Sequence, residues 1–78
     1  MQLGTRWDVG AEPPASLPED VVRGVERVEA ELEADGIDAT TWRWTLTWLE
    51  GSAVVELDDG TKVLPGGAGG AMIVPPQD

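Results

Sequence analysis

The sequence predicts a two-layer α+β domain, in which one amphipathic helix packs on a mainly antiparallel sheet of four or five strands. Three observations carry this prediction. Apolar residues recur at helical spacing over about residues 17–35, and three tryptophans alternate along residues 41–50. Two turn signals that contain glycine then follow. The expected order is β-α-β-β-β, with the helix against the tryptophan face of the sheet.

The first strand is expected over residues 1–9, where apolar and polar residues alternate. The helix follows. Ser16 and Glu19 have the spacing of a capping box at its start. Gly36 is expected to end it in the left-handed conformation, with Ile37 folding back on the last turn. The predicted core stripe comprises Val21, Val25, Val28 and Leu32.

The strand over residues 41–50 is predicted to bury one face, which carries Trp42, Trp44, Leu46 and Trp48. Gly51-Ser52 suits a two-residue type II′ turn, because glycine tolerates a positive φ at the first turn position. That turn would place Trp48 opposite Val55 and Leu46 opposite Leu57 on the core face.

The next turn is predicted at Asp58-Asp59-Gly60, as a three-residue loop with Gly60 left-handed. This loop pairs Glu56 with Lys62 and Val55 with Val63, so it satisfies both charge and burial. Leu64 then lies opposite Val54.

Residues 1–64 are expected to form a single domain. Residues 65–78 form a C-terminal segment rich in glycine and proline. Within it, residues 71–74 are predicted either to add a short edge strand or to be disordered.

The charge of the chain restricts its partners. The 78 residues include 15 Asp and Glu against 5 Lys and Arg, a net charge of −10. This excess disfavours nucleic acid and anionic membranes as partners. It favours either a well-solvated surface or a basic partner. No apolar run approaches the length of a membrane span, so a soluble, cytoplasmic protein is expected.

Little in the sequence indicates catalysis. Cysteine and histidine are absent, which removes thiol nucleophiles and Ser–His pairs. We expect no catalytic residue, no cofactor and no metal. Glu56, Asp58 and Asp59 are the best candidates for oxygen ligands of Mg²⁺ or Ca²⁺. An ordinary acidic turn explains them better, because their spacing fits no calcium loop.

The sheet face away from the helix is the predicted partner-binding surface. Leu49, Val54 and Leu64 are expected to cluster there, with Arg43 and Thr47 at the polar edge. The alternatives are that these apolar residues are an ordinary part of the surface, or that the C-terminal segment covers them.

Three functional hypotheses follow. The leading one is a non-enzymatic module that binds another protein or a second copy of itself. The second is an acidic inhibitor or regulator of a basic protein, acting through Glu26, Glu29 and Glu33. The third is a small enzyme or metal-binding domain centred on the acidic residues 56–59.

Overall fold

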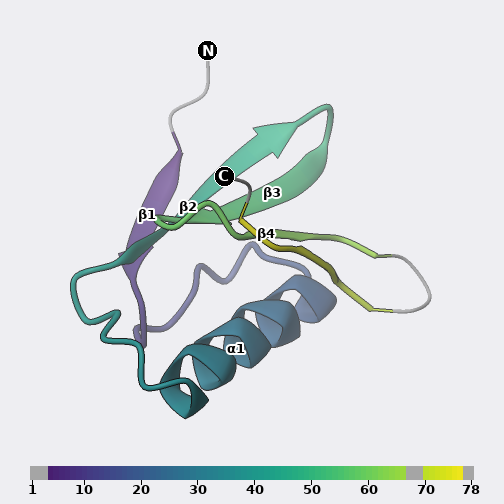
Figure 1. Cartoon of the computed structure of the whole chain (residues 1–78). Coiled ribbons are helices and arrows are strands. Elements are labelled where there is room, and N and C mark those ends of the chain that lie inside the picture. Colours follow the sequence, from purple (N-terminus) through teal and green to yellow (C-terminus); the bar gives the residue numbers. More distant parts are fainter. Residues whose placement is uncertain (1–3, 67–69, 77–78) are drawn as a thin grey trace.

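Within the residues that the structure describes, five strands form one sheet whose spatial order equals the chain order, and one helix lies across one face of it (Figure 1). This computed structural model describes residues 4–66 and 70–76. Every neighbouring strand pair is antiparallel. The predicted two-layer α+β class is confirmed. The elements are β1 (Thr5–Asp8), α1 (Glu19–Ala34), β2 (Arg43–Leu49), β3 (Ser52–Leu57), β4 (Lys62–Leu64) and β5 (Met72–Val74).

The core lies between α1 and the facing side of the sheet. The largest fully buried side chains come from both layers: Val21, Val25, Trp44, Leu46, Val55, Leu57 and Val63. Gly24 allows the layers to approach closely. A Cβ on Gly24 would lie 2.7 Å from Cγ1 of Val63, so no larger residue fits there without movement.

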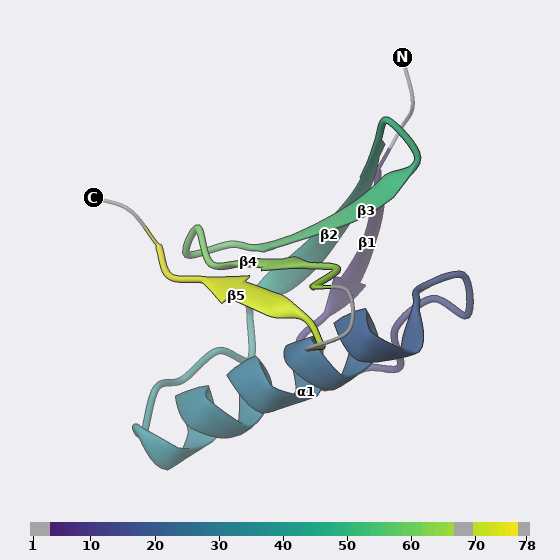
Figure 2. The ribbon, with the colours of Figure 1, turned by 90° about the vertical axis from the view of Figure 1, so that its right-hand side faces the viewer.

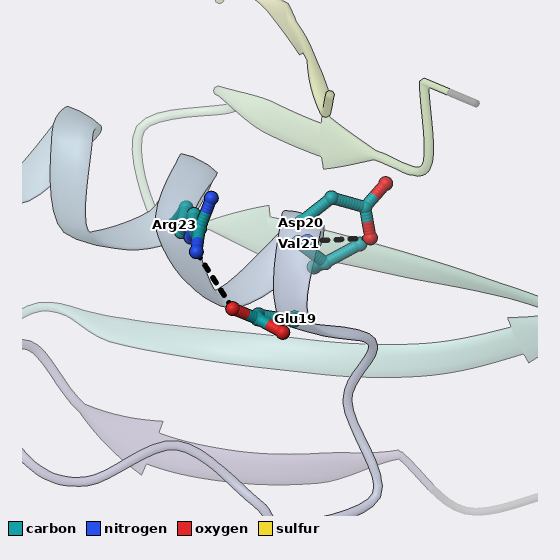
Figure 3. A network of polar contacts seen from close by, with 4 residues as sticks. All are labelled: Glu19, Asp20, Val21 and Arg23. Carbon is teal, nitrogen blue, oxygen red and sulfur yellow. Dashed lines mark hydrogen bonds and ion pairs between the residues drawn. The ribbon is translucent and has the colours of Figure 1, made fainter. Parts of the chain in front are cut away.

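The helix begins differently from the prediction. Its N-cap is Pro18, and no side chain caps it, so the expected capping box of Ser16 and Glu19 is wrong. The Glu19 carboxylate instead pairs with Arg23 Nη2 at 2.7 Å, and Asp20 Oδ1 accepts a hydrogen bond from the next backbone N–H (Figure 3). Two carboxylates in the first turn still stabilise the helix through its dipole.

The helix ends as the sequence predicts. Gly36 has φ +72°, the left-handed conformation that glycine adopts without strain. The backbone N–H of Ile37 donates to the carbonyl of Leu32 at 3.0 Å, and that of Gly36 donates to Glu33 at 3.1 Å. These two bonds form a Schellman motif.

The turn between β2 and β3 corrects the predicted register. Leu49 lies opposite Ser52, so the two turn residues are Glu50 and Gly51. Their φ angles are +51° and +81°, and two positive values identify a type I′ turn rather than type II′.

The correction slides β3 by two residues and preserves both faces of the hairpin. Trp44 lies opposite Leu57, Leu46 opposite Val55, and Trp48 opposite Ala53. The expected register would have placed Asp59 opposite the buried Trp44. Burial of the apolar partners therefore outweighs the unfavourable left-handed conformation of Glu50.

The second hairpin is confirmed. Glu56 pairs with Lys62 and Val55 with Val63, and Gly60 has φ +100°. The Gly60 N–H donates to the Leu57 carbonyl at 2.9 Å, which is the closing bond of a turn followed by a left-handed residue.

The two edge strands are both short. β1 covers Thr5–Asp8, while residues 1–3 of the predicted first strand lie outside the described residues. At the other edge, β5 pairs with β4 and places Met72 opposite Leu64. The edge-strand alternative for residues 71–74 is the one observed (Figure 2).

The predicted core face is only partly buried. Trp44 is fully buried, but Trp48 keeps 38% of its surface exposed, so its assignment to the core is wrong. Figures 1 and 2 show the reason: the tip of the β2–β3 hairpin projects away from α1. Trp42, which precedes β2, packs partly buried against the edge of the core.

Candidate interaction surfaces

A row of apolar side chains crosses the face of the sheet that α1 does not cover. Val55 and Val63 are buried on the helix side, so their neighbours Val54 and Leu64 face outward. Met72 lies opposite Leu64 and continues the row onto β5. We call Leu49, Val54, Leu64 and Met72 the outer patch.

The outer patch is accessible and slightly hollowed. Leu49 is 63% exposed and Met72 is 57% exposed. Leu49, Val54 and Leu64 line one shallow cavity of about 360 Å³, which also includes Pro65. The structure therefore brings the three predicted apolar residues together. Their side chains surround one depression across β2, β3 and β4.

The two predicted polar residues have different places. Thr47 lies directly opposite Val54 and borders the outer patch. Arg43 lies at the other end of β2, about 20 Å from Leu49 at the usual rise of a strand. There its Nε contacts Asp8 Oδ1 at 3.1 Å, and its backbone N–H donates to Asp58 Oδ2 at 3.0 Å. Arg43 is therefore not brought together with the apolar residues.

Sequence reasoning missed Met72, because it left residues 71–74 undecided. If residues 71–74 had been assumed to pair with β4 with Met72 opposite Leu64, Met72 would have been predicted on the same face, because cross-strand partners share a face. β5 lies beside β4 at the edge of the sheet and does not fold over the outer patch (Figure 2). Within residues 70–76, the C-terminal segment therefore extends the predicted surface instead of covering it.

A second surface is a cavity of about 430 Å³ between α1, the loop that follows it and the residues directly after β1. We call it the acidic groove. Its apolar lining includes Val9, Leu32 and Ile37. Its ionisable lining residues are Glu26, Glu29 and Glu33, the carboxylates of the second functional hypothesis.

The side chain of Glu29 is held in place by two hydrogen bonds to residues outside the helix. Its Oε2 accepts a hydrogen bond from the indole Nε1 of Trp44 at 2.8 Å and another from the backbone N–H of Gly10 at 3.1 Å. The sequence shows Glu29 only as one of many helix carboxylates. The one feature of the sequence that suggested a special position for Glu29 is that it lies four residues after Val25, at the border of the apolar stripe.

The acidic turn residues have local roles. Asp58 accepts from the backbone of Arg43, and Asp59 Oδ1 accepts from the backbone N–H of Thr61 at 2.8 Å. Glu56 lies opposite Lys62. Across residues 4–66 and 70–76, no three acidic side chains gather in a way that could hold a metal ion.

Asp38, in the loop beside the acidic groove, has a perturbed pKa. The hydroxyl and the backbone N–H of Thr40 both donate to Asp38 Oδ1, at 2.8 Å and 3.1 Å. These bonds stabilise the carboxylate and lower the pKa of Asp38 below its ordinary value, the side-chain bond having the larger effect.

Comparison with known proteins found no matching family model, no matching curated protein and no matching solved structure. Among the helices of the described residues, none has the length and apolar character needed to cross a membrane.

Proposed function

We propose that the protein is a non-enzymatic interaction module that forms a homodimer through the outer patch. The observation that supports this most directly is the apolar row of the outer patch across β2, β3, β4 and β5, which the helix leaves uncovered. A chain of 78 residues buries only about 60% of its unfolded surface, so covering this row would add stability that one copy lacks. A cytoplasmic location is part of the same proposal.

The outer patch is suited to a second copy of the same chain. A twofold axis along the strands, between β3 and β4, would place Val54 over Leu64 of the second copy. It would also place Glu56 over Lys62 of the second copy, and Lys62 over Glu56 of the second copy. Two sheets packed face to face in this aligned way lie about 10 Å apart, with their side chains interdigitating.

The distribution of charge supports the same arrangement. Two chains of net charge −10 repel each other, so their contact should hold few carboxylates, and Glu56 within it would face Lys62 of the second copy. Residues 60–77 contain no Asp or Glu, and they supply both β4 and β5. Leu64 and Met72, two of the four residues of the outer patch, thus belong to a segment without carboxylates.

Sedimentation equilibrium of wild type and of Val54→Lys tests the proposal. The substitution places a charge in the middle of the outer patch and leaves the buried face of β3 unchanged. We expect a dimer for wild type and a folded monomer for Val54→Lys. Ala34→Lys, on the exposed end of α1, adds the same charge elsewhere and should remain dimeric.

Exchanging the charges of Glu56 and Lys62 tests the proposed orientation of the two copies in the dimer. Glu56→Lys alone should weaken the dimer by placing two lysines over each other, and adding Lys62→Glu should restore it. A wild type that sediments as a monomer at high concentration would contradict the homodimer. An unfolded Val54→Lys would show that this position belongs to the core.

A further inference from the structure

We propose that the acidic groove is a binding site for a basic and apolar peptide segment of a partner protein. Arginine or lysine side chains of the segment would contact Glu26, Glu29 and Glu33, and its apolar side chains would pack between them. The groove is formed by α1, the loop after it and the residues directly after β1, so this proposal does not depend on the dimer through the outer patch.

The lining of the groove combines the two features that such a segment needs. Val9, Leu32 and Ile37 supply apolar surface, and Ile37 keeps 43% of its own surface exposed. The ionisable groups of the lining are all carboxylates. Its volume of about 430 Å³ accommodates a few side chains rather than a whole domain.

The spacing of the carboxylates suits an extended segment. Glu26 and Glu33 are separated by about two helical turns, or roughly 10 Å along the axis. An extended chain covers that length with three or four residues, at about 3.3 Å each. Two basic side chains could therefore contact Glu26 and Glu33 at once, with Glu29 between them.

Glu29 provides a carboxylate that is already ordered. Both of its recorded hydrogen bonds, to Trp44 and to Gly10, involve Oε2. Within residues 4–66 and 70–76, no hydrogen bond to Oε1 is recorded, so this oxygen is available to accept a bond from a cation. Because the side chain is fixed beforehand, binding costs little further ordering, and a bond to a charged donor is among the stronger ones.

The charge of the whole molecule favours the same ligand. A net charge of −10 raises the local concentration of basic segments and repels acidic ones. The field alone does not select one site, because other carboxylates of the helix are exposed as well. The apolar lining distinguishes the groove, so the segment must carry apolar side chains in addition to positive charge.

The test uses the full chain and a blocked octapeptide in which arginine and leucine alternate. Isothermal titration calorimetry at low and at moderate salt measures its affinity. A peptide with glycine in place of leucine should bind more weakly at both salts, and a peptide with glutamate in place of arginine should not bind.

Two double variants with equal change of charge locate the site. Glu26→Gln with Glu33→Gln removes two groove carboxylates, and Glu12→Gln with Glu31→Gln removes two exposed carboxylates that do not line the groove. We expect the first pair to weaken binding by about tenfold and the second by less than about threefold, because only the first removes carboxylates that contact the peptide, and each exposed ion pair is weak. In the NMR spectrum, the peptide should shift the indole N–H signal of Trp44, which reports on Glu29.

Equal losses in the two double variants would show attraction to the overall charge only and would overturn the site. The same follows if the glycine peptide binds as well as the leucine peptide, or if no peptide binds. Val54→Lys, which tests the dimer, should bind the octapeptide as wild type does, so failure of one proposal is distinguishable from failure of the other.

Discussion

The carboxylate of Glu29 accepts a hydrogen bond from the indole N–H of Trp44 at 2.8 Å, and this bond joins the helix to strand β2 of the sheet. Trp44 is the largest fully buried side chain, so its N–H has no access to water. The same Glu29 oxygen accepts from Gly10, directly after the first strand region. One carboxylate thus connects the helix, the sheet and the loop that follows β1.

Replacing Glu29 should therefore destabilise the fold. Glu29→Ala leaves the Trp44 N–H buried without an acceptor, at an expected cost of about 1–3 kcal/mol in the free energy of unfolding. Glu29→Gln keeps an acceptor oxygen and should cost less. Glu33→Ala, an exposed helix carboxylate one turn later, should change stability by less than about 0.5 kcal/mol. Urea unfolding decides, and equal effects of Glu29→Ala and Glu33→Ala would contradict the role of the bond.

The two tryptophans at positions 44 and 48 should respond differently to truncation, although they share one face of β2. Trp44→Ala removes a fully buried ring and should cost about 3–5 kcal/mol. Trp48 keeps 38% of its surface exposed, so Trp48→Ala should cost less than half as much. Thermal unfolding compares the variants. If Trp48→Ala lost as much stability as Trp44→Ala, Trp48 would belong to the core after all.

The left-handed Glu50 offers a way to stabilise the protein. Its φ of +51° is unfavourable for glutamate, whereas asparagine tolerates this conformation and Asn-Gly is the preferred type I′ pair. Glu50→Asn should therefore raise stability by about 0.5–1 kcal/mol. Glu12→Asn, the same exchange in an exposed loop, should be nearly neutral. A destabilised Glu50→Asn would argue against the type I′ turn and the register that depends on it.

The lowered pKa of Asp38 should depend on Thr40. Thr40→Val removes the hydroxyl donor and keeps the backbone N–H, so the pKa of Asp38 should rise toward its ordinary value without reaching it. A carboxyl whose pKa is lowered by folding stabilises the protein above its unfolded pKa. This contribution disappears as the pH falls through the folded value. An NMR titration of the Asp38 carboxyl carbon measures the shift, with Thr41→Val as the control that should leave it unchanged.

Sequence reasoning predicted the faces of the strands better than their register. Alternation places Leu46, Val55 and Leu57 on one side whichever turn joins the strands, because a slide of two residues keeps the side of every residue. The type of turn depends on a competition between the backbone preferences of the turn residues and the burial of apolar partners along the two strands, which the local sequence does not reveal. Glycine at position 51 suits either turn type, and burial of Leu57 opposite Trp44 decides between them.

The candidate surfaces were predictable to different degrees. The clustering of Leu49, Val54 and Leu64 was expected from alternation and from the registers of the two hairpins. The β2–β3 register differs, so Leu49 lies opposite Ser52 and not opposite Val54, but the three side chains still line one depression. Arg43 is on the same face of the sheet but at the far end of β2. Alternation predicts the face on which a residue lies, but not how far along the strand it is from the other residues of that face. The anchoring of Glu29 depends on where Trp44 points its N–H, which no pattern in the sequence records.

The agreement between the order of the strands in the sheet and their order in the chain has a consequence for folding kinetics. Three of the four strand pairs join neighbouring segments, across turns or the short connection of residues 65–71. Only the pairing of β1 with β2 must close a long loop, residues 9–42, which contains the helix. Loop closure of that length is the slow entropic step. The β2–β3–β4 meander should form first, and the joining of β1 should limit the rate at which the native protein appears.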